Sequence, residues 1–127
     1  MFGPLDFVYL PSRDVAADLD HWTQAGGEVV FAIARFDTRV AMLRLGSGPG
    51  FLLAQHLEGD APVLVYRVDD LEAAVSDLGA RGLAVGERFE FPYGDAVEVP
   101  SPDPQRVAIY ERTRADRGDS LRGRRDF

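Results

Sequence analysis

Few side chains in this 127-residue sequence are of the types that carry out chemistry, because it contains no cysteine and only two histidines. His21 stands next to Trp22 in a segment of helical periodicity, where Trp22 is expected in the core and His21 in water. His56 opens a polar connection, and neither histidine stands at a spacing from a serine or aspartate that suggests a nucleophilic triad. Glu90 and Glu98 fall in short strand candidates and could act as general bases only if buried. The sequence therefore assigns no catalytic residue.

Arg67 is the charged residue whose position most needs an explanation, because it follows the apolar run Val63-Leu64-Val65-Tyr66. A cation on such a strand needs a partner, and a ligand carboxylate or Glu98 could supply one. In the alternative interpretation, Arg67 stands at the strand end and its guanidinium reaches water. The sequence favours this second interpretation.

An internal repeat shows which elements position these residues. It appears when the sequence is compared with itself at a shift of 56 residues. The aligned positions are 7–10 with 63–66, Asp14 with Asp70, Val15 with Leu71, Leu19 with Val75, Trp22 with Leu78, and Gly26 with Gly82. The aspartates can accept hydrogen bonds from the free N–H groups of a first helical turn, and the glycines can end a helix. Each copy is therefore predicted to contain an apolar strand followed by a capped helix.

Three shorter strand candidates follow each predicted helix, separated by turns that contain glycine and proline. They span Glu28–Ala34, Arg39–Leu45 and Phe51–His56 in the first copy and Ala84–Phe91, Ala96–Val99 and Arg106–Glu111 in the second. The sequence predicts a β-α-β-β-β order twice within a single domain of residues 1–112, with repeats 5–57 and 61–112. Residues 113–127 are rich in arginine and poor in apolar groups, which predicts a mobile tail.

The charge composition limits the expected partners. The formal net charge is −7, and residues 1–111 contain eight arginines against eighteen aspartates and glutamates. Because an acidic body repels phosphate backbones, no nucleic-acid partner is expected. No apolar run approaches the roughly 18 to 20 residues of a membrane span, and the N-terminus has no signal-like stretch, so a cytoplasmic protein without a membrane partner is expected. The lack of cysteine excludes disulfides and thiolate chemistry.

Two segments of the second copy resemble a known superfamily. Tyr66-Arg67-Val68-Asp69-Asp70-Leu71 resembles the strand-to-helix junction of the vicinal oxygen chelate superfamily, which includes glyoxalases, bleomycin-resistance proteins and extradiol dioxygenases. Ser101-Pro102-Asp103-Pro104-Gln105-Arg106 resembles its Asp-Pro-Asp-Gly-Asn turn, with Ser101 and Pro104 departing from the pattern. The resemblance covers about residues 5–112 and implies an α+β fold in which two βαβββ repeats form an open mixed β-barrel.

In this superfamily, strand side chains that face the barrel interior hold a divalent metal. Carried over by position, the ligand sites become Phe7, Val63, Leu52 and Ala108, none of which has a donor atom for a metal. A different strand register would bring in Gln55 or His56. Neighbouring residues on a strand face opposite ways, however, so only one of the two could become a ligand. The sequence therefore predicts no metal and no other cofactor.

Strand periodicity places residues two positions from these sites on the same side, which predicts an apolar and partly aromatic groove. Its predicted lining is Phe7, Tyr9, Leu52, Ala54, Val63, Val65, Arg67, Ala108 and Tyr110. Such a surface suits a flat or hydrophobic small molecule oriented by tyrosine hydroxyls and one guanidinium. In the alternative interpretation, the same side chains simply fill the barrel as its core.

Three functions remain open from the sequence. The first is a metal-free protein that binds a small apolar or aromatic ligand, and its resemblance to bleomycin-resistance proteins implies a homodimer. The second is a metal-dependent lyase, isomerase or dioxygenase of the same superfamily, built on a different strand register. The third is a non-catalytic accessory or regulatory subunit whose interior is packed and whose outer surface or tail does the work.

Overall fold

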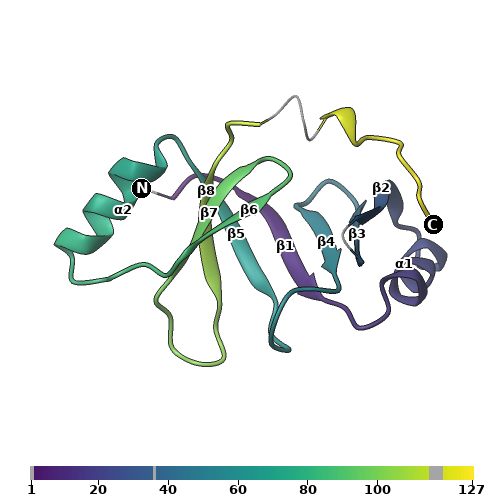
Figure 1. Ribbon diagram of the computed structural model, residues 1–127, viewed down its shortest axis with the longest axis horizontal. Coiled ribbons are helices and arrows are strands. Elements are labelled where there is room, and N and C mark those ends of the chain that lie inside the picture. The colour runs from purple at the N-terminus through teal and green to yellow at the C-terminus, as the bar shows by residue number, and fades with distance from the viewer. Residues whose placement is uncertain (1, 36, 115–118) are drawn as a thin grey trace. The chain divides into compact units, whose positions relative to one another are not determined.

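The structure, a computed structural model, describes residues 2–35, 37–114 and 119–127. The chain divides into two compact units that follow the internal repeat. The first-repeat unit comprises Phe7–Pro62 and Leu121–Phe127, and the second-repeat unit comprises Met1–Asp6 and Val63–Ser120. In the described residues, each unit has a helix of ten residues and strands of a mixed sheet (Figure 1).

The first-repeat unit has the predicted βαβββ order. Its elements are β1 (Leu5–Pro11), α1 (Val15–Gln24), β2 (Glu28–Arg35), β3 (Thr38–Arg44) and β4 (Gly50–Ala54). The strands lie in the order β2-β3-β4-β1, with β1 parallel to β4 and the other pairs antiparallel. The first two residues of β1, Leu5 and Asp6, are counted with the second-repeat unit.

The second-repeat unit repeats this order. Its elements are β5 (Val63–Val68), α2 (Leu71–Ala80), β6 (Arg88–Phe91), β7 (Gly94–Val99) and β8 (Val107–Glu111). The strands lie in the order β5-β8-β7-β6, and β5 is parallel to β8 in the same way as β1 is to β4. The predicted α+β class with two βαβββ repeats is confirmed.

Both helices begin and end where the sequence predicts. Asp14 and Asp70 accept hydrogen bonds of 3.0 Å from the backbone N–H groups of Ala17 and Ala73, which satisfies donors that have no partner within the first turn. Gly26 and Gly82 follow the helices with φ of 103° and 83°, a left-handed conformation that glycine adopts without steric cost.

The strands predicted after each helix differ from the observed ones by one or two residues at their ends, except β6, which differs by four. The segment Ala84–Phe91 is expected to be a single strand, but β6 begins at Arg88. Before that point Gly86 donates one backbone hydrogen bond to the Glu98 carbonyl, at 3.1 Å. The shorter strand shows that the apolar residues of this segment pack without a continuous ladder.

The C-terminal segment lies along the edge of β2, in contrast to the mobile tail expected from composition. The backbone N–H of Gly123 donates to the Val30 carbonyl at 2.7 Å, and the N–H of Ala32 donates to the Arg124 carbonyl at 2.8 Å. Phe127 packs against the apolar cluster under α1. This segment supplies partners for backbone groups of an edge strand, which composition alone does not reveal. The predicted tail also includes residues 115–118, which lie outside the described residues.

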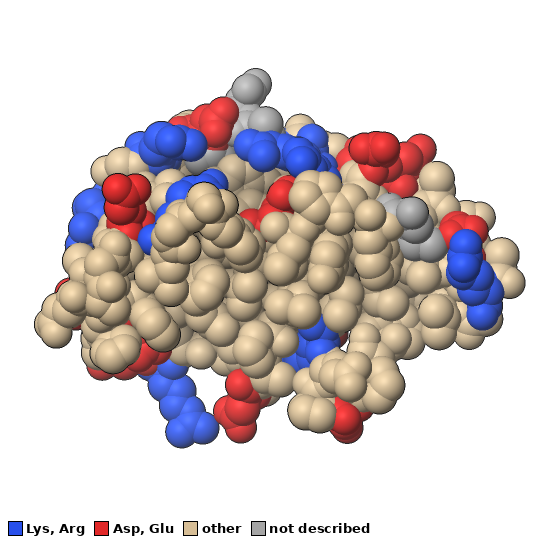
Figure 2. Space-filling view, turned by 180° about the vertical axis from the view of Figure 1, so that it is seen from behind, with Lys and Arg blue, Asp and Glu red and all other residues tan. Residues whose placement is uncertain are grey.

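Positive and negative side chains are intermixed on the surface. On the face seen in Figure 2, blue and red residues lie next to one another rather than in separate patches. In the C-terminal segment the guanidinium of Arg124 lies 3.0 Å from the carboxylate of Asp126, so one of its arginines is paired locally. Within the described ranges, no helix is long and apolar enough to cross a membrane.

Candidate functional site

In the first-repeat unit, α1 covers one face of the sheet and the predicted groove residues lie on the other. Leu10 and Leu53 pack with the helix residues Val15 and Leu19. Because successive side chains of a strand alternate between faces, their neighbours point to the opposite side, which we call the non-helical face. The predicted groove residues on it are Phe7, Tyr9, Leu52 and Ala54, all of which are at most 5% exposed.

Strand register holds these residues together. Tyr9 is the register partner of Leu52 across the parallel β1–β4 pair, and Leu52 is also the partner of Met42 on β3. Ala54 is the partner of Val40, which is half-buried. The non-helical face of this unit therefore carries a continuous set of apolar side chains on β1, β4 and β3, of which Val40 is half-buried and the others named here are buried.

The second-repeat unit has the same arrangement. Tyr66, Val68 and Ile109 pack against α2, so the alternate residues of β5 and β8 lie on the non-helical face. The predicted groove residues on it are Val63, Val65, Arg67, Ala108 and Tyr110. Val65 pairs in register with Ala108, and Arg67 pairs with Tyr110. All of these except Arg67 are buried, and the Arg67 side chain is 40% exposed.

A phenol–imidazole pair ends the non-helical face of the first-repeat unit. The Tyr9 hydroxyl lies 2.9 Å from His56 Nε2, and His56 Nδ1 lies 3.4 Å from the Thr38 hydroxyl. Burial raises the pKa of the Tyr9 hydroxyl to about 12 and lowers the pKa of His56 below its ordinary value. Both groups are therefore neutral at neutral pH, and together they can accept a proton or orient a hydrogen-bonding ligand.

Strand periodicity predicts Tyr9 on this face, but nothing in the sequence connects Tyr9 with His56, which is 47 residues away. The only sequence signal is strand periodicity. Thr38 precedes Val40 by two positions on β3 and so continues the alternation of the face, whereas His56 follows Ala54, the last residue of β4, by two positions.

A second polar cluster ends the non-helical face of the second-repeat unit. The Tyr110 hydroxyl donates a hydrogen bond of 2.5 Å to Asp6 Oδ2, and Arg67 Nε lies 3.4 Å from the same oxygen. Burial raises the pKa of Tyr110, and the hydrogen bond and charge of Asp6 raise it further. Tyr110 thus remains a protonated donor, and Asp6 stands between a phenol and a guanidinium.

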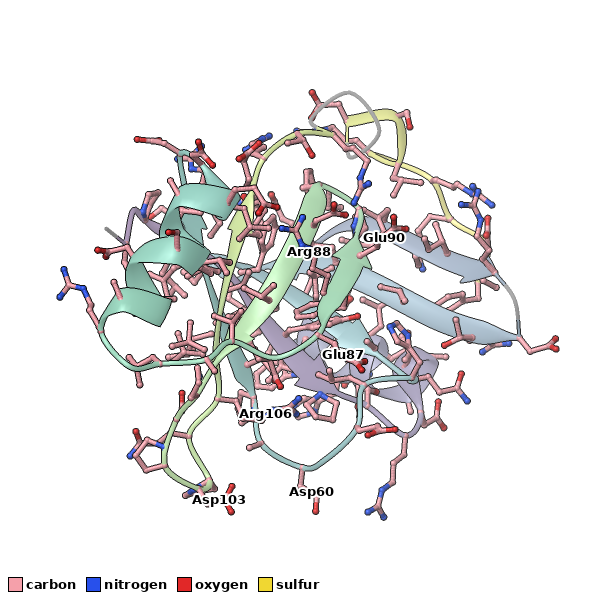
Figure 3. The ribbon with its side chains drawn as sticks, turned by 60° about the vertical axis from the view of Figure 1, so that its left-hand side comes forward. Asp60, Glu87, Arg88, Glu90, Asp103 and Arg106 are labelled. Carbon is pink, nitrogen blue, oxygen red and sulfur yellow. The ribbon has the colours of Figure 1, made fainter. Side chains whose placement is uncertain are left out.

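The ion-pair partner of Arg67 differs from the partner suggested by the sequence. Arg67 pairs with Asp6, whereas Glu98 accepts hydrogen bonds from Arg106 Nε and Nη2 at 2.9 and 2.7 Å. A hollow of about 380 Å³ lies beside the Glu98–Arg106 pair. Figure 3 shows Arg106 at the base of the loop between β7 and β8, and Asp103 at its tip.

The side chains at the superfamily's metal-ligand positions do not fit a metal ion. Phe7 and Leu52 in one unit, and Val63 and Ala108 in the other, are buried hydrocarbons without a donor atom. In the part of the chain that the structure describes, no three His, Cys, Asp or Glu side chains are grouped so that they could hold an ion. The donor set of these strands is thus unlike that of a divalent metal site.

No family model and no curated protein matches the sequence. Among solved structures, methylmalonyl-CoA epimerase from Mycobacterium tuberculosis matches with a TM-score of 0.71 and 19% identity, covering 87% of this chain and 88% of that one. A hypothetical protein from Bacillus halodurans C-125 matches with a TM-score of 0.71 and 12% identity, covering 84% and 92%. Glyoxalase I from Zea mays matches with a TM-score of 0.60 and 19% identity, covering 87% of this chain and 43% of that one.

These likenesses establish the architectural class of the protein. The chain has the fold of the vicinal oxygen chelate superfamily, as its second-repeat motifs indicate. It spans less than half of the maize enzyme and most of the mycobacterial one. At these identities the likeness defines the fold, and the function has to be argued from the chain's own residues.

Proposed function

We propose that this protein binds a small apolar or aromatic compound on the non-helical face of its sheet and requires no metal ion to do so. The observation that carries the proposal is the replacement of metal-ligand positions by Phe7, Leu52, Val63 and Ala108. These positions, which hold donor atoms in metal-dependent relatives, here extend an apolar surface.

The composition of the face supports an aromatic ligand over a polar one. An apolar compound gains about 25 cal/mol for each Å² of apolar surface that it removes from water, and hydrocarbon side chains supply the complementary surface. Tyr9 and Tyr110 each combine an aromatic ring with a hydroxyl at the end of the face, and such groups fix the orientation of a bound ring. Few other polar groups are needed for specificity.

Equilibrium binding of 1-aminoanthracene, a neutral aromatic dye whose fluorescence rises in apolar sites, tests the proposal. We expect saturable binding that is unchanged by EDTA, together with an increase in melting temperature. At a free dye concentration one hundred times Kd, mass action adds about 2.7 kcal/mol to the free energy of unfolding. Nickel, zinc, iron and manganese ions should leave the melting temperature unchanged.

A pair of matched variants locates the binding site. Ala54→Leu adds bulk to the non-helical face, and we expect it to weaken dye binding at least tenfold. Ala17→Leu makes the same change on the exposed surface of α1 and should bind like the wild type. Ala54→Val is the smaller alternative if leucine prevents folding.

Two results would contradict the proposal. Lack of dye binding by the folded protein would show that the face is filled as core. The second is a stoichiometric metal ion that is retained through purification and is required for binding. It would show that other side chains form a metal site.

A further inference from the structure

The Tyr9–His56–Thr38 cluster has a hydrogen-bond arrangement that leaves one imidazole nitrogen weakly engaged. His56 Nε2 makes a 2.9 Å hydrogen bond to the Tyr9 hydroxyl, whereas Nδ1 and the Thr38 hydroxyl are separated by 3.4 Å, near the outer limit for such a bond. Tyr9 is buried and His56 is exposed. The exposed imidazole is therefore held more closely through Nε2 than through Nδ1.

We infer that His56 recognises an acidic hydroxyl group, a phenol or an enol, which binds as its anion after giving its proton to His56 Nδ1. This inference rests on the proposed function, because the aromatic part of the compound would pack on the non-helical face. It adds the chemical class of the ligand, which an apolar surface does not define.

The proton transfer is balanced within the complex. The ligand O–H donates to Nδ1, the O–H bond breaks with its electron pair remaining on oxygen, and an N–H bond forms. The resulting imidazolium donates from Nε2 to the Tyr9 oxygen and from Nδ1 to the ligand oxygen. The Thr38 hydroxyl, released from its long contact, can donate to the same anion. The step requires the tautomer in which Nε2–H donates to the Tyr9 oxygen and Nδ1 is the acceptor, and Tyr9 is a positioning residue because it receives that hydrogen bond.

The electrostatic surroundings agree with this assignment. Although the side chain as a whole is exposed, partial desolvation of the ring lowers the pKa of His56, which favours a neutral imidazole that can accept a proton, and a bound anion offsets the cost of the new charge. Arg35 is the register partner of Thr38, Glu58 follows His56 by two positions, and both are exposed. Water and salt screen such exposed charges.

Apolar neighbours define where the rest of the ligand lies. Ala54, the last residue of β4, precedes His56 by two positions, and its register partner Val40 is half-buried. An aromatic ring that carries the acidic hydroxyl can contact Val40 while the oxygen reaches His56. This geometry favours a hydroxyl attached directly to the ring.

The pair 4-nitrophenol and 4-nitroanisole tests the inference. They share the nitroaromatic ring, but the second is a methyl ether that has no proton to give. The ionised phenol absorbs visible light and the neutral phenol does not. At mildly acidic pH, where the free probe is neutral, wild-type protein should raise the visible absorbance on titration. It should also bind the phenol about tenfold more tightly than the ether, as a charge-assisted hydrogen bond provides.

Variants separate the roles of the residues. His56→Gln should abolish the absorbance rise and bring the affinity for the phenol down to that for the ether. Tyr9→Phe should reduce the absorbance rise and narrow the difference in affinity between phenol and ether. His21→Gln removes the other histidine, which is exposed on α1, and should behave like the wild type.

Calorimetry supplies an independent readout. At a pH where the free phenol is already ionised, its binding should take up about one proton from the buffer per complex, and His56→Gln should take up none. Equal affinity for phenol and ether, with no absorbance rise and no proton uptake, would overturn the inference and leave the proposed function standing. Failure of both compounds to bind would contradict both proposals.

Discussion

The buried hydroxyl of Tyr9 predicts a defined loss of stability at alkaline pH. Burial raises the pKa of this hydroxyl to about 12 in the folded protein, whereas an unfolded tyrosine titrates near 10. As the pH rises, the unfolded chain loses this proton first. The contribution of the neutral phenol to stability is therefore fully present below about pH 10 and is lost as the pH approaches about 12.

The magnitude follows from the width of this interval. One unit of pKa difference corresponds to about 1.4 kcal/mol, so a difference of two units removes about 3 kcal/mol from the free energy of unfolding. The Tyr9→Phe variant has no hydroxyl to ionise at this position. Over the same pH range, its free energy of unfolding should therefore fall by about 3 kcal/mol less than that of the wild type. Its stability at neutral pH is lower by the hydrogen bond to His56, about 1 kcal/mol.

Urea unfolding followed by Trp22 fluorescence between pH 8 and pH 12 measures both effects. Tyr66→Phe is the matched control, because Tyr66 lies half-buried on the opposite, helix-facing side of its sheet and stacks on Phe2. It should show the pH dependence of the wild type. Parallel curves for wild type and Tyr9→Phe over the whole range would refute the claim that this hydroxyl is held neutral by burial.

Three further predictions concern the supporting contacts. Tyr110→Phe removes a hydrogen bond to the carboxylate of Asp6 and should lower the free energy of unfolding by about 1.5 to 3 kcal/mol in urea titrations; an unchanged midpoint would contradict the importance of this bond. Asp14→Ala removes the cap of α1 and should cost about 1 kcal/mol, whereas Asp20→Ala, at an exposed helical position, should cost less than half of that by thermal melting. Deletion of residues 121–127 should free the edge of β2 and promote concentration-dependent association, measured by light scattering; a truncated protein that stays as monodisperse as the full chain would exclude this role.

The fold could be predicted because its signals are local. Asp14 and Asp70 cap helices through contacts within three residues, and glycines at 26 and 82 end them within one turn. Because the pattern recurs after 56 residues, the sequence predicts two similar units, and no long-range contact has to be known for this prediction. The face on which each strand residue lies is predicted from the alternation of side chains along a strand. Of the nine predicted groove residues, four lie in the first-repeat unit and five in the second-repeat unit.

The polar clusters could not be predicted, because they join residues that are distant in sequence. The hydroxyl of Tyr110 and the carboxylate of Asp6 are 104 positions apart, and no periodicity relates them. Arg67 was expected to reach Glu98 or water because strand alternation alone gives no means of ranking distant carboxylates. The position of the C-terminal segment could not be predicted for a related reason, since the packing of Phe127 depends on an apolar cluster formed by α1 and its sheet.

The placement of the C-terminal segment affects the order in which the chain can complete its structure during synthesis. The first-repeat unit needs Leu121–Phe127, which leave the ribosome only after the entire second repeat has been made. Until then β2 has an uncovered edge, and the nascent chain is open to pairing with other extended polypeptides. Chaperone binding during translation is therefore expected to concentrate on the repeat that is synthesised first.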